Sequence, residues 1–257
     1  MGRVRATGTI WSMANPVLTR TFAPAEGQPA PPSIIDTGDR MTMSSVVKQT
    51  GLFFLILLAG AVYGWTQFSP NEFGAGFLWL MLGLFGLLIV TMVRPQWVRV
   101  TGPLFAAAEG VLVGAISGIY SEFYDGIVFQ AILATFAVFA VMLFLYANRI
   151  IKVTARLRST IIVATAGIAL FYVASIVLSL FGVDIPYVWD GGPISILLSV
   201  FIVGVAAFNL LLDFDIIEQG VREGAPGWMS WFAAFGLMVT VVWLYLELLR
   251  LLALTRD

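Results

Sequence analysis

The chain has 257 residues, of which 60% are hydrophobic and only 11% are charged, and its formal net charge is −1. A soluble domain carries about 25% charged residues, so this chain has too few charges to cover a water-facing surface. The sequence contains no histidine and no cysteine. This excludes Ser-His-Asp and Cys-His catalysis, zinc or haem held by those side chains, and any disulfide. The near-neutral charge gives no sign of nucleic-acid binding. Composition therefore indicates an integral membrane protein.

Residues 1–44 form the most polar part of the chain and contain five prolines. No apolar stretch follows Arg3 and Arg5, which argues against a signal peptide. We expect 1–44 to be a flexible cytoplasmic tail, followed by a membrane domain over 45–257.

Seven apolar runs follow the tail, each close to the roughly 20 residues that a membrane-spanning helix needs. They cover 51–68, 77–93, 103–120, 127–147, 160–181, 193–212 and 229–252. The sequence therefore predicts an all-α integral membrane protein with about seven transmembrane helices in one bundle. Because the connections are short, consecutive helices are expected to be antiparallel neighbours in the lipid bilayer.

Basic residues lie on alternate sides of these runs. All but two of the 14 lysines and arginines fall in the tail or beside the connections that follow the second, fourth and sixth runs. The intervening connections contain acidic residues and no basic ones. By the positive-inside rule, the N-terminus should be cytoplasmic and the C-terminus should lie outside.

Glycines spaced four residues apart mark two of the runs. Gly110, Gly114 and Gly118 share one face of the third run, and Gly60 and Gly64 share one face of the first. Such faces let helix backbones approach closely in lipid, so we expect a packing interface here. A substrate groove is the less favoured alternative.

Ionisable residues inside the apolar runs are the candidate functional residues, because burying one in a membrane costs roughly 3 kcal/mol or more. Glu109 lies in the third run, Asp213 and Asp215 lie at the inner end of the sixth, and Glu247 lies in the last. Arg94 closes the second run. We interpret these five as candidates for an ion pathway and a pH sensor.

Depth along the helices brings three of these residues to one level. At about 1.5 Å per residue, Glu109 lies about 9 Å inside its run, and Asp213 and Arg94 lie near the same side. Carboxylates at Asp213 and Glu109 could then bind calcium transiently. We further expect an ionised Asp213 to hold Arg94 and close the inner mouth, and a proton to release it. In a competing interpretation, Asp213 and Asp215 simply begin a solvated loop.

Two further polar residues have a simpler interpretation. Glu247 and Arg250 are three residues apart on one helix, which predicts a structural ion pair. Asn209 in the sixth run is expected to bond to a neighbouring helix.

Three segments resemble the Bax-inhibitor-like family of transmembrane Bax inhibitor motif proteins, particularly its bacterial branch. They are AAAEGVLVGAISGIYSEFYDG, LLDFDIIEQGVREGAP and AAFGLMVTVVWLYLELLRLL, and the resemblance runs from about residue 42 to the end. It implies a seven-helix bundle with the last helix at its centre. Family members are pH-sensitive calcium-leak channels or, in eukaryotes, suppressors of cell death.

The resemblance also implies a proton sensor, made of two acidic residues on the last two helices and an arginine of the second. Asp213 in LLDFD matches the first acid, and Arg94 is the arginine. The second position is either Glu247, if LYLE is matched, or Thr240, if AAFGL is matched. If Thr240 is correct, Glu109 or Asp215 would supply the second carboxylate.

These observations lead to one expected function and its alternatives. We expect a pH-sensitive cation leak channel in a bacterial cytoplasmic membrane, with calcium as the permeant ion and no other cofactor. The alternative is a non-conducting regulator that binds a membrane protease or another membrane protein. An intramembrane hydrolase built on paired aspartates is a third, less favoured interpretation, because histidine, cysteine and an intramembrane lysine are missing.

Overall fold

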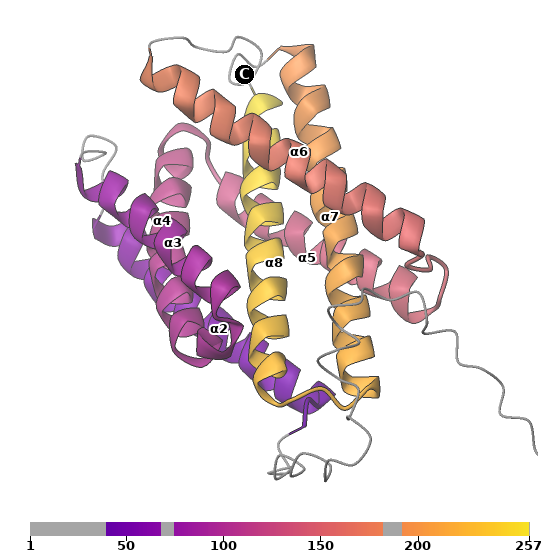
Figure 1. Cartoon of the computed structure of the whole chain (residues 1–257). Helices are drawn as coiled ribbons and strands as arrows, with labels where there is room; N and C mark the ends of the chain where they lie inside the picture. The colour runs from indigo at the N-terminus through magenta and orange to yellow at the C-terminus, as the bar shows by residue number, and fades with distance from the viewer. Residues whose placement is uncertain (1–39, 68–74, 182–191, 257) are drawn as a thin grey trace, which may run out of the picture. The chain divides into compact units, whose positions relative to one another are not determined.

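The structure is a computed structural model, and it describes residues 40–67, 75–181 and 192–256. These residues form seven α-helices and one short 3₁₀ turn (Figure 1). In chain order the elements are α2 (Met43–Gln67), α3 (Ala75–Val93), η3 (Pro95–Trp97), α4 (Val98–Phe123), α5 (Ile127–Ala147), α6 (Ala155–Leu180), α7 (Pro193–Arg222) and α8 (Trp228–Leu254). Most of the tail predicted over 1–44 lies outside the described residues.

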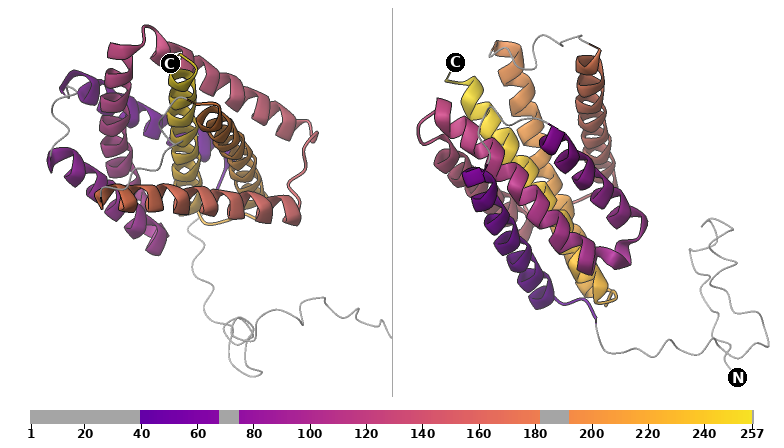
Figure 2. Two further views of the ribbon diagram at one scale, coloured as in Figure 1. Left: turned by 90° about the horizontal axis from the view of Figure 1, so that it is seen from above. Right: turned by 90° about the vertical axis from the view of Figure 1, so that its left-hand side faces the viewer.

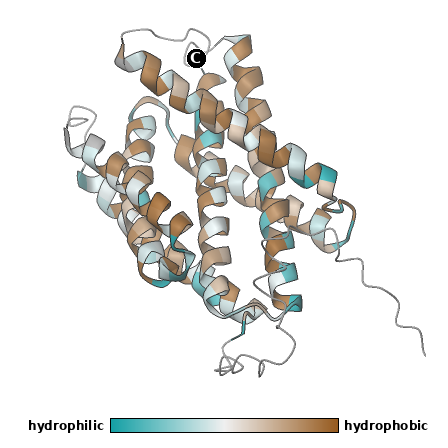
Figure 3. Cartoon of the chain, viewed as in Figure 1, coloured by the Kyte–Doolittle hydropathy of each residue, from teal (hydrophilic) through white to brown (hydrophobic). Residues whose placement is uncertain are grey.

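Six stretches of 21 to 30 residues, all of the helices except α3, are long and apolar enough to cross a membrane. The seventh helix, α3, has 19 residues, which corresponds to about 28 Å. This is close to the thickness of a bilayer's hydrocarbon core. Hydrophobic residues run along all the helices, and hydrophilic ones gather where α6 begins and α7 ends (Figure 3). The prediction of an all-α membrane protein with about seven spans is confirmed.

The last helix, α8, lies at the centre of the bundle, as the family resemblance implied (Figures 1 and 2). It packs against α2, α4, α5 and α7. In its most apolar stretch 56% of the residues are buried, whereas only 11% are buried in α6. Thus α8 is surrounded by protein, while α6 presents most of its surface outward.

Contacts between connections show which helix ends lie together. Arg149, just after α5, forms an ion pair with Glu218 near the end of α7. At the opposite end of the bundle, the Arg256 guanidinium donates a 3.0 Å hydrogen bond to the carbonyl of Asp125, in the α4–α5 connection. Consecutive helices therefore alternate in direction, as predicted. They are not all neighbours, however: in the described residues α2 packs on α4 and not on α3, and α5 does not pack on α6, so that part of the prediction is wrong. We call the end where α7 finishes and α8 starts the basic end.

Two predicted helix boundaries are wrong by eight residues or more. The sixth predicted run ends at residue 212, but α7 continues as a regular helix to Arg222. The first run was predicted from residue 51, but α2 begins at Met43, and Met41 before it is only 3% exposed. In the extension of α7, Asp215 and Glu218 accept hydrogen bonds from Arg158 and Arg149. Just before α2, the Met41 N–H donates a 2.7 Å hydrogen bond to the Ala225 carbonyl, which fixes the start of that helix at the same end.

The glycine faces form the interface between α2 and α4, which run parallel to each other. A Cβ added to Gly114 would lie 2.6 Å from the carbonyl carbon of Ala61 and 2.7 Å from its Cα. A Cβ added to Gly118 would instead meet no atom closer than 3.8 Å. The glycines whose added Cβ would collide with the partner backbone are Gly60, Gly64, Gly110 and Gly114. The predicted packing interface is confirmed.

Candidate functional site

Glu109 lies on the face of α4 that packs against α8. Phe105, one turn before it, stacks edge-on against Phe235 of α8 with ring centroids 5.1 Å apart. Two turns after Glu109, the Ser117 hydroxyl is 2.6 Å from the hydroxyl of Tyr245. Interpolating between these two contacts places Glu109 beside the part of α8 near residue 238.

The Glu109 side chain is half-buried, and its Oε2 atom is fully buried without a hydrogen-bond partner among the described residues. It lies 11 residues after the start of α4 at Val98, or about 17 Å along the helix. This is deeper than the predicted 9 Å, because α4 begins five residues before the predicted run. Glu109 therefore belongs to the interior of the bundle.

Asp213 lies between α7 and α8. A Cβ added to Gly236 of α8 would be 3.8 Å from Asp213 Oδ1. Thr240, whose hydroxyl donates a 3.1 Å hydrogen bond to the Gly236 carbonyl, interacts with the same carboxyl group. The other oxygen, Oδ2, is buried and has no hydrogen-bond partner in the described part of the chain.

The extension of α7 decides the environment of Asp213. Because the helix continues for nine residues to Arg222, Asp213 lies about 14 Å from its end. The interpretation in which it begins a solvated loop is therefore wrong. Asp213 and Glu109 face α8 from different helices at nearly the same level, around residues 236–240.

Arg94 is not part of this arrangement. Its side chain is exposed, at the junction of α3 and η3, and no ion pair joins it to Asp213 or Glu109 in the described structure. The predicted contact between Arg94 and Asp213 is absent because Asp213 lies two to three turns inside α7, whereas Arg94 lies at a helix end.

Asp215 also lies apart from Asp213. Two residues on an α-helix are about 200° apart around its axis, so the two carboxylates of LLDFD point in nearly opposite directions. Asp215 accepts hydrogen bonds of 2.5 Å from Arg158 of α6 and from the Gln219 side chain. It therefore fastens α6 to α7 and does not supply a second acid beside Asp213.

A second polar contact fastens the α5–α6 connection to the same helix. Glu218 accepts hydrogen bonds from the Tyr146 hydroxyl and the Arg149 guanidinium. This contact raises the pKa of Arg149 above its ordinary value. The sequence analysis missed Glu218 because it lies in the segment taken for a loop. Its position one turn after Asp215 is the signal that could have identified it.

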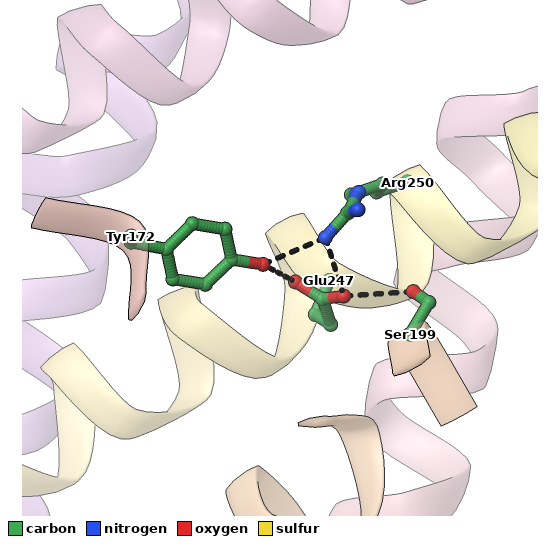
Figure 4. Close-up of polar contacts among 4 residues, drawn as sticks. All are labelled: Tyr172, Ser199, Glu247 and Arg250. Carbon is green, nitrogen blue, oxygen red and sulfur yellow. Dashed lines mark hydrogen bonds and ion pairs between the residues drawn. The ribbon is translucent and has the colours of Figure 1, made fainter. Parts of the chain in front are cut away.

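Glu247 forms the centre of a buried polar network that joins three helices (Figure 4). The side chains of Glu247 and Arg250 are 5% and 7% exposed, and Arg250 Nη1 lies 3.2 Å from Glu247 Oε1. The same oxygen accepts a 2.7 Å bond from Ser199 of α7. Tyr172 of α6 donates a 2.9 Å bond to the other oxygen and accepts a 2.7 Å bond from Arg250. The predicted ion pair is confirmed, and Tyr172 and Ser199 are additional members.

The network separates Glu247 from Asp213. Thr240, which lies beside Asp213, precedes Glu247 by seven residues, or about 11 Å along α8. Thr240, and not Glu247, therefore lies beside Asp213, and Glu247 has partners of its own. The predicted bond of Asn209 to a neighbouring helix is also present, since its amide donates to Thr165 of α6 at 2.8 Å.

The acidic residues do not gather into a metal centre in the described part of the chain. No group of three or more acidic side chains there is placed to hold a metal ion. Glu109 and Asp213 are the two carboxyl groups of the bundle interior that each retain a buried oxygen without a partner.

Taken together, the apolar helices, the central α8 and the interior carboxyl groups define a multi-span helical membrane protein. Residues 15–257 match the family model described as Bax inhibitor 1 like, and the chain belongs to this family. A comparison with curated proteins gives no match.

Proposed function

We propose that this protein is a pH-sensitive cation leak channel, with calcium as the permeant ion and a path along α8 past Glu109 and Asp213. One observation carries the proposal. Two carboxyl groups from different helices lie at the same level of the central helix, and each has a buried oxygen without a hydrogen-bond partner. A carboxyl group kept inside a membrane for structure alone is expected to be paired, as Glu247 is.

The two carboxyl groups can serve both binding and pH sensing. Ionised carboxylates attract a divalent cation, and hard oxygen ligands suit calcium. Conduction also requires that the ion can leave, so binding must not be too strong. A proton on one carboxyl group removes half of the negative charge facing the ion. Flux is therefore expected to rise as the pH falls from about 8 to about 5.

We further propose that the basic end faces the cytoplasm of a bacterial cell, as the distribution of lysine and arginine favours. We propose no catalytic role and no cofactor. The alternative, a non-conducting regulator that binds a membrane protease or another membrane protein, makes a different prediction, because such a protein gives no flux on its own.

Flux through purified protein tests the proposal. The protein is reconstituted into liposomes of phosphatidylethanolamine and phosphatidylglycerol that contain a calcium-sensitive dye, and uptake is measured from pH 5 to pH 8. The variants are Asp213→Asn, Glu109→Gln and, as a matched control on the same helix as Glu109, Glu122→Gln at an exposed position.

We expect wild-type flux to exceed that of protein-free liposomes and to rise as the pH falls. Asp213→Asn and Glu109→Gln should each flatten the pH dependence, whereas Glu122→Gln should retain it. Absence of flux in the wild-type protein would refute the channel and favour the regulator. A pH curve unchanged in both interior variants would refute the assigned path.

A further inference from the structure

An apolar groove lies between four helices, and its lining does not include Glu109, Asp213 or Glu247. It has a volume of about 730 Å³ and is lined by α2, α4, α5 and α8. Its lining on α2 extends from Thr50 to Thr66, or about 24 Å along the helix. The groove therefore runs through most of the roughly 30 Å hydrocarbon core of a bilayer.

The groove has a buried floor and an exposed rim. Leu237 and Val242 of α8 form part of the floor and are 7% and 4% exposed. Val62 of α2 and Phe136 of α5 lie on the rim and are 66% and 67% exposed. Helices α2 and α5 both pack on α8 but do not pack extensively on each other. The groove therefore opens sideways between them, toward the lipid.

Most polar groups in the lining already have partners within the protein. The Ser117 and Tyr245 hydroxyls bond to each other, and the Thr135 hydroxyl donates a 2.7 Å bond to the carbonyl of Ala131. The Oγ1 atom of Thr50, nearest the basic end, is buried in the wall and is not open to the groove. The groove thus suits a long apolar ligand.

We infer that the groove binds one acyl chain of a bilayer phospholipid. Lipid is the medium that surrounds the exposed rim, so a chain can enter without leaving the bilayer. An extended acyl chain matches an apolar groove that runs along most of the hydrocarbon core.

The test uses covalent labelling, so its outcome is independent of whether the protein conducts ions. The full-length protein is reconstituted into liposomes of phosphatidylethanolamine and phosphatidylglycerol. A small fraction of the lipid is a phosphatidylglycerol with a photoreactive diazirine midway along one acyl chain. After irradiation, labelled peptides are identified by mass spectrometry. Lipids that merely surround the protein can reach exposed residues such as Val173 of α6, but cannot reach Leu237 or Val242.

We expect label on the floor residues of α8 as well as on the exposed residues of α6. Val241→Phe, at a half-buried lining position, should fill the groove and lower floor labelling several-fold. Ile132→Trp at the rim should also lower floor labelling several-fold, and it replaces Val241→Phe in the test if that variant does not fold. Val173→Trp, outside the groove, is the matched control and should leave floor labelling unchanged. Label confined to outward-facing residues, or floor labelling that neither groove variant reduces, would overturn the inference.

Discussion

The network around Glu247 allows a test of how α6, α7 and α8 are held together. Arg250→Met keeps an apolar stem of similar length but removes the guanidinium. Glu247 then remains buried, with only the hydroxyls of Tyr172 and Ser199 as donors. The double variant Glu247→Gln with Arg250→Met removes both charges. Its amide can still accept a hydrogen bond from one of the two hydroxyls with its oxygen and donate one to the other hydroxyl with its NH2 group.

The expected magnitude follows from burial. Both side chains are less than a tenth exposed, so neither charge is screened by water. Removing one partner of a buried ion pair costs about 3–5 kcal/mol, mainly because the other charge stays unpaired, whereas removing both charges together is often close to neutral. The single variant should therefore lose about 3 kcal/mol or more of stability, and the double variant should recover most of it.

Unfolding in mixed detergent micelles, followed by tryptophan fluorescence, provides the measurement. Tyr172→Phe is a useful companion, because it removes one hydrogen bond to each of the two charged groups and leaves the ion pair itself. It should cost about 1–3 kcal/mol. If Arg250→Met unfolds like the wild type, or if the double variant is no more stable than the single one, the coupling between these two charges is refuted.

The remaining predictions concern packing, topology and the tail. Gly114→Ala should destabilise the bundle by about 1–3 kcal/mol, because the new methyl group meets the backbone of α2, whereas Gly118→Ala should be nearly neutral; thermal unfolding compares them. A reporter fused after residue 257 should be active only on the outside of the membrane, and activity in the cytoplasm would contradict the proposed orientation. Deletion of 2–38 should preserve insertion and melting temperature, since this segment is polar and rich in proline; loss of insertion would contradict this.

Several features of the molecule follow from local sequence alone. Apolar runs of about 20 residues predict the membrane helices. A helix of that length crosses the hydrocarbon core, and it satisfies its backbone hydrogen bonds internally. Glycines at intervals of four identify the α2–α4 interface, since helical periodicity places them on one face. The ion pair between Glu247 and Arg250 is also a local contact, three residues apart on one helix.

Tertiary structure decided which carboxyl groups are paired. Glu247 meets Ser199 and Tyr172, which are 48 and 75 residues away in the chain. Asp215 meets Arg158 across α6 and α7, while Asp213, two residues earlier, points toward α8. Spacing in the sequence gives the angle between two side chains on one helix. The rotation of that helix relative to its neighbours depends on how the whole bundle packs.

The same reason explains the errors at the basic end. The polar segment after residue 212 has the composition of a loop, yet it continues α7 to Arg222, because Asp215 and Glu218 find cationic partners on α6 and on the α5–α6 connection. This extension carries Asp213 into the bundle and away from Arg94. Hydropathy reports whether a residue prefers lipid or water, and that preference determined the class of protein. Hydropathy could not show that Glu109 and Asp213 lie at one level of α8. That placement depends on how far each helix is shifted along its neighbour, and contacts between residues far apart in the chain determine this shift.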